Sequence, residues 1–241
     1  MYAVRSSGSY INLHVNCFGP KILPRDSCVH KWIQALEITE IPFSYILLTG
    51  MSIIGAVLKR NVYVDQRFWK VFPNLNLMLI GPSGVGKDTV INQVKQVISE
   101  IGQPAIIGGK TIERVEADLF ELGDPAVAYI TASELTSFLG GKDYQESMTQ
   151  ELTDLLSNNP EKDISLKGDK KNPQLKDAFG KRIIRRPTIT MHAGSTIDWL
   201  HKAMPEGSLE GGFLPRFLLL IEEYTGKHIP LVKYDISLDE Q

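Results

Sequence analysis

The feature that most constrains this chain is a glycine-rich turn between an apolar stretch and a helix-like segment. Residues 75–80 read Leu-Asn-Leu-Met-Leu-Ile, residues 81–87 read Gly-Pro-Ser-Gly-Val-Gly-Lys, and apolar residues then recur at helical spacing up to residue 101. Such glycines let backbone N–H groups face a β-phosphate, the lysine reaches the β- and γ-oxygens, and the helix adds its positive end. The sequence therefore predicts a site for ATP or GTP. The predicted phosphate-binding residues are Gly81, Pro82, Ser83, Gly84, Val85, Gly86, Lys87, Asp88 and Thr89.

The turn departs from the usual pattern at the position that contacts Mg²⁺. In Gly-x-x-x-x-Gly-Lys-[Ser/Thr] the last residue offers a hydroxyl to the metal, but here Asp88 takes that place and Thr89 follows one residue late. We expect Mg²⁺ as a cofactor, held by Asp88, Thr89 and Ser133. Either Asp88 or Thr89 would supply the contact that Ser133 lacks. Alternatively, Asp88 only complements the positive end of the helix dipole.

An acidic residue follows the next long apolar stretch, residues 126–131. A nucleotide hydrolase needs an acid at the end of a strand beside the phosphate loop, to order the metal or the attacking water. Here the usual Asp-Glu pair is replaced by Ser133-Glu134, so the sequence predicts that Glu134 orients the water. The alternative is that Ser133 caps a helix and Glu134 lies in its first turn.

Two further polar residues stand beside apolar stretches. Ser195 follows residues 187–193, where a hydroxyl can sense a γ-phosphate, although it can equally cap the next helix. Arg216 ends the run Gly-Gly-Phe-Leu-Pro-Arg, and its planar fork suits transition-state oxygens, including those in a neighbouring subunit. A structural ion pair is the alternative for this arginine. The predicted catalytic residues are Lys87, Glu134 and Arg216.

The charge of the chain is low overall but locally concentrated. The 241 residues are 43% hydrophobic and 22% charged, with a net charge of −2, as in an ordinary soluble globular protein without a global basic field. Residues 165–186 nevertheless hold eight Lys or Arg against two Asp. A basic loop can hold phosphates without reading sequence, so we predict contacts to a DNA backbone, the alternative being a solvated loop without function. The predicted nucleic-acid residues are Lys167, Lys170, Lys171, Lys181 and Arg182.

Cysteine content and apolar runs bear on the compartment. Cys17 and Cys28 are the only cysteines, which indicates neither a disulfide framework nor a zinc site. No charged and apolar signal segment opens the chain, so we expect a cytoplasmic protein. The uncharged run 41–58 is barely long enough for a membrane span, and its Pro, Gly, Ser and Thr residues favour a buried helix and no membrane partner.

The order of expected elements predicts an α/β fold with a mostly parallel sheet flanked by helices. Residues 1–27 form an irregular arm with a short strand near 10–15, and residues 28–72 a small helical N-terminal unit. That unit has expected helices at 29–37 and 43–59 and strands at 62–64 and 68–71. Residues 73–241 form the ATPase core. Its expected strands are 75–80, 105–107, 126–131, 187–193 and 216–222, and its expected helices are 88–101, 111–122, 133–140, 144–157 and 195–204.

Taken in order, these motifs resemble a family of phage and mobile-element P-loop ATPases related to superfamily III and AAA+-like helicases and primase-helicases. The resemblance rests on the phosphate loop, Ser-Glu-Leu at 133–135, Ser-Thr-Ile-Asp-Trp-Leu at 195–200 and the arginine segment at 211–216. Thr-Glu-Ile-Pro at 39–42 and Arg-Asn-Val-Tyr-Val at 60–64 extend it. It implies a P-loop NTPase core of the ASCE/AAA+-like type, a homo-oligomer such as a ring in which Arg216 completes a neighbour's site, and location in the host cytoplasm.

The resemblance also implies a function. The leading hypothesis is an ATP-driven, helicase-like DNA motor in phage or mobile-element replication, with a replication partner such as a primase. Two alternatives stay open. Gly-Lys-Asp-Thr also resembles the phosphate loops of nucleoside monophosphate kinases, and Ser133 is consistent with a nucleotide-gated scaffold that hydrolyses ATP weakly.

Overall fold

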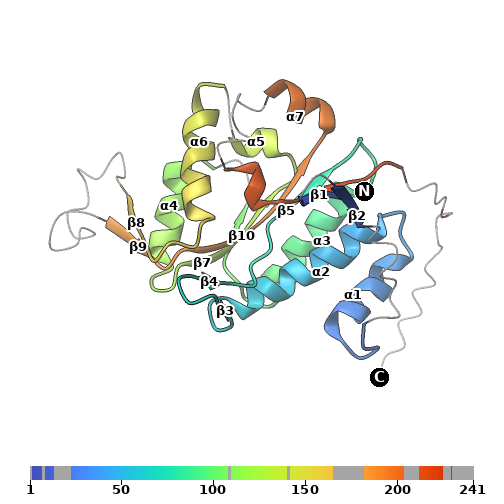
Figure 1. The fold of residues 1–241 in the computed structure, drawn as a ribbon, viewed down its shortest axis with the longest axis horizontal. Helices are drawn as coiled ribbons and strands as arrows, with labels where there is room; N and C mark the ends of the chain where they lie inside the picture. Colours follow the sequence, from blue (N-terminus) through green and yellow to red (C-terminus); the bar gives the residue numbers. More distant parts are fainter. Residues whose placement is uncertain are drawn as a thin grey trace.

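A five-stranded parallel sheet lies at the centre of the molecule (Figure 1). The computed structural model describes residues 2–6, 9–13, 23–107, 110–139, 142–164, 182–203, 212–224 and 229. Across the sheet the strands run in the order β11, β5, β10, β7, β6, and every neighbouring pair is parallel. The strand bounds are β5 Leu77–Ile80, β6 Ala105–Ile107, β7 Val127–Ala132, β10 Thr188–Ser195 and β11 Leu218–Ile221. The expected α/β class and mostly parallel sheet are confirmed.

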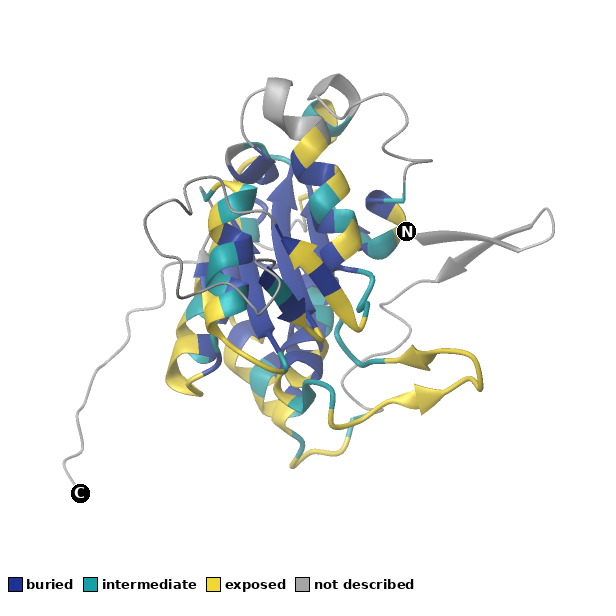
Figure 2. Cartoon of the chain, turned by 90° about the vertical axis from the view of Figure 1, so that its left-hand side faces the viewer, coloured by how far each residue is buried: buried dark blue, intermediate teal, exposed yellow. Residues whose placement is uncertain are grey.

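The central strands are buried along their whole length, as parallel strands covered on both faces must be (Figure 2). Alternating side chains of β5 divide between two apolar clusters. Met78 and Ile80 belong to the cluster under α4, α5 and α6, whereas Leu77 and Leu79 belong to the cluster under α1, α2 and α3. The sheet therefore separates two cores, and its strands read as continuous apolar runs in the sequence.

Three helices cover one face of the sheet. They are α1 Cys28–Glu37, α2 Phe43–Leu58 and α3 Lys87–Glu100. Ser27 caps α1, since its Oγ accepts a hydrogen bond from the backbone N–H of His30 at 3.2 Å. Helix α2 lies against α1, α3, β5 and β10, so the N-terminal helices share a core with α3 and one face of the sheet. The division at residue 72 stays a prediction. None of the described helices is long and apolar enough to cross a bilayer.

The opposite face carries α4 Ile112–Glu121, α5 Leu135–Leu139 and α6 Lys142–Leu155, whereas α7 Ile197–Ala203 follows β10 (Figure 1). A short 3-10 helix, η5 Leu214–Arg216, leads into β11. Most predicted helix bounds lie within two residues of the observed ones. The strand predicted at 216–222 begins two residues later, so Arg216 belongs to the turn before the strand rather than to the strand.

The described residues also form antiparallel strand pairs outside the central sheet. They are β1 Tyr2–Ser6 with β2 Ser9–Leu13, β3 Val64–Asp65 with β4 Lys70–Val71, and β8 Glu161–Ile164 with β9 Arg182–Arg185. Short strands were expected near β2, β3 and β4. The β8–β9 pair was missed, because Glu-Lys-Asp-Ile reads as a polar segment. In the structure Lys162 is buried and paired with Glu151 at 2.5 Å and Asp154 at 2.8 Å.

Candidate functional site

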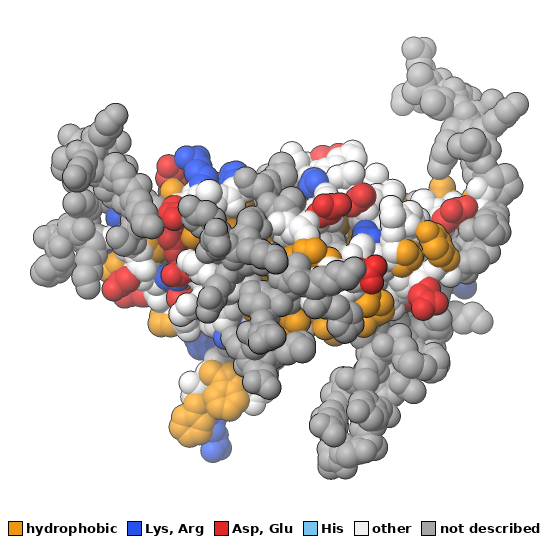
Figure 3. Space-filling view, turned by 90° about the horizontal axis from the view of Figure 1, so that it is seen from above, with side chains coloured by type: hydrophobic (Ala, Val, Ile, Leu, Met, Phe, Trp, Pro, Cys, Tyr) orange, Lys and Arg blue, Asp and Glu red, His pale blue; other side chains and the backbone are white. Residues whose placement is uncertain are grey.

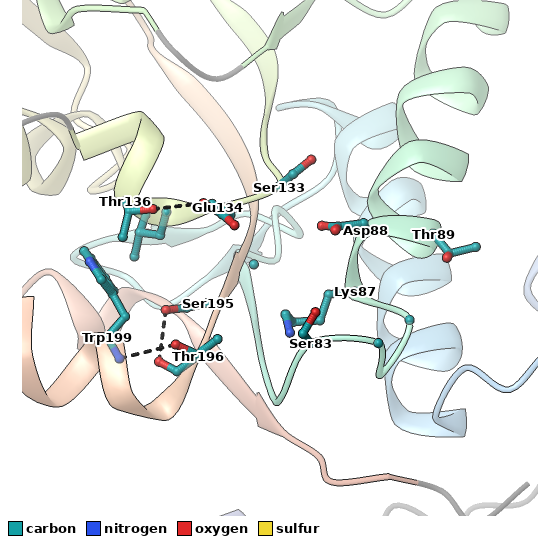
Figure 4. A pocket seen from close by; sticks show the side chains of 14 residues that line it. Ser83, Lys87, Asp88, Thr89, Ser133, Glu134, Thr136, Ser195, Thr196 and Trp199 are labelled. Atoms are coloured by element: carbon teal, nitrogen blue, oxygen red, sulfur yellow. Dashed lines mark hydrogen bonds between the residues drawn. The ribbon is translucent and has the colours of Figure 1, made fainter.

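A cavity of about 360 Å³ opens at the carboxyl edge of the sheet, where the segments after β5, β7 and β10 meet (Figure 4). These three segments come from strands that lie side by side, so residues more than a hundred positions apart line one space. The cavity is lined by Ser83, Gly84, Gly86, Lys87, Asp88, Thr89, Ser133, Glu134, Leu135, Thr136, Gly194, Ser195, Thr196 and Trp199. The sequence-predicted phosphate, metal and water-orienting residues are therefore together, apart from three loop residues that do not line the cavity.

The loop at 81–86 has a backbone shape that only glycine adopts at low cost. Gly84 and Gly86 have φ angles of +85° and +90°, in the left-handed region. A Cβ on Gly81 would lie 2.5 Å from the carbonyl oxygen of Glu222, and one on Gly86 would lie 2.9 Å from a side-chain carbon of Ile41. The spacing of the glycines thus reflects two left-handed turns and two close approaches.

Lys87 is the cation of the loop. Its Nζ donates hydrogen bonds to the carbonyl oxygens of Gly81 at 2.6 Å and Pro82 at 2.7 Å. Partial burial lowers the pKa of Lys87 from its ordinary value, and the nearby carboxylates of Asp88 and Glu134 act in the opposite direction. The ammonium is therefore bonded to two loop carbonyls and is influenced electrostatically by two acidic side chains.

The same loop leads directly into the N-terminus of α3. Gly86 is the N-cap residue and provides no side chain to accept from the first amides of the helix, while Asp88 lies in the first turn. These first-turn N–H groups and the helix dipole make the end of α3 favourable to an anion. The adjacent Lys87 adds a full positive charge at the same place.

The candidate metal ligands differ in how they point. In Figure 4 the carboxylate of Asp88 is directed toward Glu134, whereas the Thr89 side chain points away from both. The hydroxyl of Ser133 accepts a hydrogen bond from Nζ of Lys95 at 3.2 Å, so an ammonium already occupies one direction of approach to it. The described residues contain no cluster of three acidic or imidazole ligands. Mg²⁺ commonly uses one or two carboxylates with phosphate and water, and Asp88 fits that ligand set best.

Glu134 is exposed to the cavity, and its Oε2 accepts a long hydrogen bond of 3.4 Å from Thr136. It follows β7, and β10 separates that strand from β5. The strand between them ends in Ser195, which is buried and bonds through its carbonyl oxygen to the N–H of Gly81 at 3.2 Å. The helix after it is capped by Thr196, whose Oγ1 accepts from the N–H of Trp199. The interpretation of Ser195 as this cap is therefore wrong.

Several residues in or beside the cavity were missed in the sequence. Trp199 and Thr136 carry no pattern that separates them from ordinary helix positions, and Lys95 reads as a solvent-facing lysine on α3. Tyr224 follows β11 and donates from its hydroxyl to the carbonyl oxygen of Ser83 at 2.8 Å. With Glu222 it lines a second hollow beside the loop at 81–86.

Arg216 is not part of this cavity. It lies two residues before Leu218, which pairs with Leu77 at the start of β5, whereas the loop follows the other end of that strand. The run from Leu77 to Gly81 alone covers about 13 Å at 3.3 Å per residue. Its guanidinium donates to Oγ of Ser157 at 2.7 and 3.1 Å and to the carbonyl oxygen of Gly212. These acceptors are neutral, so the structural ion pair considered above is not seen among the described residues.

Most of the predicted DNA-binding residues, Lys167, Lys170, Lys171 and Lys181, lie outside the described residues. Arg182 is described, and it is 7% exposed with its guanidinium 5.4 Å from the ring centre of Phe120. A buried guanidinium cannot contact a DNA backbone, so the prediction that Arg182 binds nucleic acid is wrong.

His192 is an interior residue, as expected. It lies in β10 without exposure, and neither ring nitrogen has a hydrogen-bond partner among the described residues. Burial lowers the pKa of this imidazole to about 3, so it is neutral at physiological pH.

Comparison with known proteins does not assign the chain to a family. The chain matches no protein-family model, and no curated protein sequence matches it significantly.

Proposed function

We propose that this chain binds ATP with Mg²⁺ on the loop at 81–89 and hydrolyses the γ-phosphate. The observation that carries the proposal is the glycine loop joining a buried parallel strand to the N-terminus of α3, with Lys87 at the start of that helix. Backbone N–H groups, helix dipole and ammonium converge there, which is the chemistry that a polyphosphate needs. The ammonium of Lys87 would exchange its two carbonyl acceptors for phosphate oxygens when the nucleotide enters.

The acidic residues fit the two remaining tasks. Asp88 is the best-placed ligand for Mg²⁺, which would neutralise charge developing on the phosphate oxygens. Glu134 faces the cavity from the adjoining segment and is placed to accept a hydrogen bond from a water and orient it. Ser133 offers only a hydroxyl shared with Lys95, so we expect slower hydrolysis than in a site with a second metal-binding carboxylate.

The strand order favours an ATPase over a monophosphate kinase. Strand β10 lies between the strand that leads into the loop and the strand that leads to Glu134, which is the arrangement expected of the ASCE-type core. Ser195 at the end of β10 then comes between the phosphate loop and the water-orienting acid, where it can sense the γ-phosphate. This supports the hydrolytic assignment.

An oligomer is part of this proposal, and the position of Arg216 limits how that arginine could contribute to it. It lies at the amino edge of the sheet and the cavity at the carboxyl edge, farther apart than an arginine side chain extends. Arg216 can therefore act on a nucleotide only in a neighbouring subunit, as in a ring. At this level we propose a helicase-like DNA motor in the host cytoplasm, working beside a replication partner such as a primase.

Steady-state ATP hydrolysis tests the proposal. The proteins are the wild type, Lys87→Ala, Arg216→Ala and, as a control, Lys31→Ala at an exposed site on α1, each measured over a protein concentration series with and without DNA. We expect Lys87→Ala to abolish turnover, and Arg216→Ala to remove a component that rises more than linearly with concentration.

The outcomes separate the functions. DNA-stimulated turnover that depends on Lys87 and Arg216 would support the motor. Nucleotide binding without turnover would favour a gated scaffold, and transfer of phosphate to a nucleoside monophosphate would favour a kinase. Turnover unchanged in Lys87→Ala would overturn the site itself.

A further inference from the structure

A short hairpin at the amino edge of the sheet presents aromatic side chains to solvent. It is the segment 59–72, built on β3 and β4, and every residue from 61 to 71 is exposed. Phe68 is 90% exposed and Trp69 is 62% exposed, and Val64 on the facing strand is 58% exposed. Figure 2 shows the hairpin as a yellow projection from the buried sheet. Side chains of this size are normally buried, so their display indicates a binding surface.

The aromatic residues are held on a defined turn. The N–H of Gln66 donates to the carbonyl oxygen of Trp69 at 3.0 Å, and the N–H of Arg67 donates to Oδ1 of Asp65 at 2.8 Å. Arg67 itself has a φ of +69°, a left-handed conformation that tightens the turn. Phe68 and Trp69 therefore stand at a fixed tip.

The hairpin is also basic, although the chain is not. Residues 59–72 contain Lys59, Arg60, Arg67 and Lys70 against Asp65, a net charge of +3 in a chain of net charge −2. In Figure 3 orange hydrophobic and blue basic side chains gather on this projection at lower left.

Two of the cations stack on aromatic rings of the hairpin. Nζ of Lys70 lies 3.9 Å from the ring centre of Tyr63, and the guanidinium of Arg60 lies 4.0 Å from that of Phe72. Arg60 also donates to Oγ1 of Thr188 at 3.1 Å, which ties the base of the hairpin to β10.

We propose that this hairpin binds single-stranded nucleic acid, with bases stacking on Phe68 and Trp69 and phosphates contacting Arg67 and Lys70. Exposed aromatic faces interleaved with basic residues are the two components of sequence-tolerant single-strand binding. The positive charge decides between occupants, because it complements a polyanion and would be unfavourable against an apolar protein face. The hairpin is a different segment of the sequence from the basic stretch at 165–186.

The hairpin is joined to the nucleotide cavity by two rigid elements. Helix α2 ends where the hairpin begins, and β5 follows shortly after it. At the other end of α2, the Tyr45 hydroxyl donates to the carbonyl oxygen of Ile80 at 2.7 Å, directly before the phosphate loop. A nucleic acid bound at the hairpin and ATP bound at the loop would thus both contact segments attached to α2 and β5. The binding proposal does not depend on hydrolysis, since it is measured without nucleotide.

The test is fluorescence anisotropy of a labelled 20-nucleotide oligo-dT and of a 20-base-pair duplex, without ATP. The variants are the double change Phe68→Ala with Trp69→Ala, the double change Arg67→Gln with Lys70→Gln, and Trp69→Phe. The controls are Lys31→Gln and Ile38→Ala, an exposed lysine and an exposed isoleucine at α1. Thermal melts check that each variant folds, and exposed positions predict unchanged melting.

We expect the wild type to bind oligo-dT more tightly than the duplex and the aromatic double variant to bind at least about 30-fold more weakly. Trp69→Phe keeps the stacking face and should stay within about threefold. The basic double variant should reduce the slope of log K against log salt by about 1.4, since each phosphate that a cation no longer neutralises lowers the slope by about 0.7. The α1 controls should bind like the wild type.

The reverse pattern would overturn the inference. Wild-type affinity in the aromatic double variant, or absence of oligo-dT binding by folded wild type, removes the hairpin as a nucleic-acid site. A change in oligomer mass on sedimentation of that variant, with unaltered DNA binding, would assign the hairpin to an interface between copies of the chain instead. Loss of ATP turnover in Lys87→Ala leaves these results unaffected, so the two proposals fail separately.

Discussion

Gly194 offers the sharpest test of how the cavity is built. It lies in β10 directly beneath the segment that carries Ser133 and Glu134, and a Cβ at this position would lie 2.3 Å from the carbonyl oxygen of Ser133. Both partners are backbone, so no side chain can rotate to make room. Gly194→Ala therefore displaces the segment that carries Ser133 and Glu134 relative to β10.

The size of the effect follows from that distance. Real Cβ atoms essentially never approach another heavy atom closer than 3.0 Å, so the gap must widen from 2.3 Å by at least 0.7 Å. Overpacking of this kind destabilises the folded state by about 1–3 kcal/mol. Replacing glycine by alanine also lowers the conformational entropy of the unfolded chain, which stabilises the protein by about 0.4–1 kcal/mol. A net loss of about 1–2 kcal/mol lowers Tm by about 2–8 °C in a domain of this size. If Glu134 orients the attacking water as proposed, displacing its carboxylate by a comparable distance should reduce kcat about 10- to 100-fold.

Thermal unfolding and ATP turnover measure the two effects separately. Gly102→Ala is the matched control, because Gly102 has a φ of +65° and open space around its missing Cβ, and follows the end of α3 away from the loop. Its left-handed backbone alone should cost about 1–2 kcal/mol. We expect both variants to melt earlier but only Gly194→Ala to lose turnover. A Gly194→Ala protein with wild-type Tm and wild-type kcat would refute the reasoning.

Three further outcomes are expected. Asn76→Ala should lower the free energy of unfolding by about 2–4 kcal/mol in urea titrations, because the buried amide accepts from the N–H of Met191 at 2.9 Å and donates to the carbonyl oxygen of Arg216 at 3.2 Å; a loss under about 1 kcal/mol would contradict this. Burial raises the pKa of Glu116 to about 7, so the folded state binds this proton more tightly than the unfolded state does. Stability should therefore fall as the pH rises from about 4.5 to 7, and Glu116→Gln should flatten that fall in thermal melts across this range. His192→Leu should leave the free energy of unfolding at pH 7 unchanged or raise it by up to about 1 kcal/mol, since it removes a buried imidazole without a partner among the described residues. Because burial lowers the pKa of His192 to about 3, the stability of the variant relative to the wild type should increase as the pH falls from about 6.5 toward 3. Strong destabilisation at pH 7 would show that the ring has a partner.

Local sequence signals predicted most of the sheet and nine of the fourteen residues that line the cavity. The loop at 81–87 could be predicted because glycine is the residue that adopts its left-handed φ angles at low cost. Helix α3 could be predicted because Val90, Ile91, Val94 and Ile98 repeat at helical spacing, and all four are buried. Glu134 and Ser195 could be placed because carboxyl ends of parallel strands meet at one edge. These inferences needed only neighbouring residues and the order of strands.

The rest depended on contacts between distant segments. Lys162 is buried because Glu151 and Asp154 from α6 meet it, and no pattern around residue 162 encodes those partners. Ser133 looked free to approach a metal, but Lys95 reaches it from two turns along α3. The sequence likewise showed Arg182 as one of a run of cations, whereas its place in β9 buries it under α4.

The two edges of the sheet divide the chemistry. The groups proposed to bind phosphate lie at the carboxyl edge, while Arg216 and the β3–β4 hairpin lie at the amino edge. An interface that brought Arg216 to another nucleotide must therefore pair unlike edges of successive subunits, which is a heterologous arrangement and closes only as a ring or extends as a filament. Arg216 would first have to leave Ser157, a neutral acceptor, and exchanging it for phosphate oxygens strengthens the interaction. A nucleotide bound to one subunit would then contact Arg216 of the next subunit. The hairpin proposed to bind single-stranded nucleic acid would lie at the same edge of every subunit.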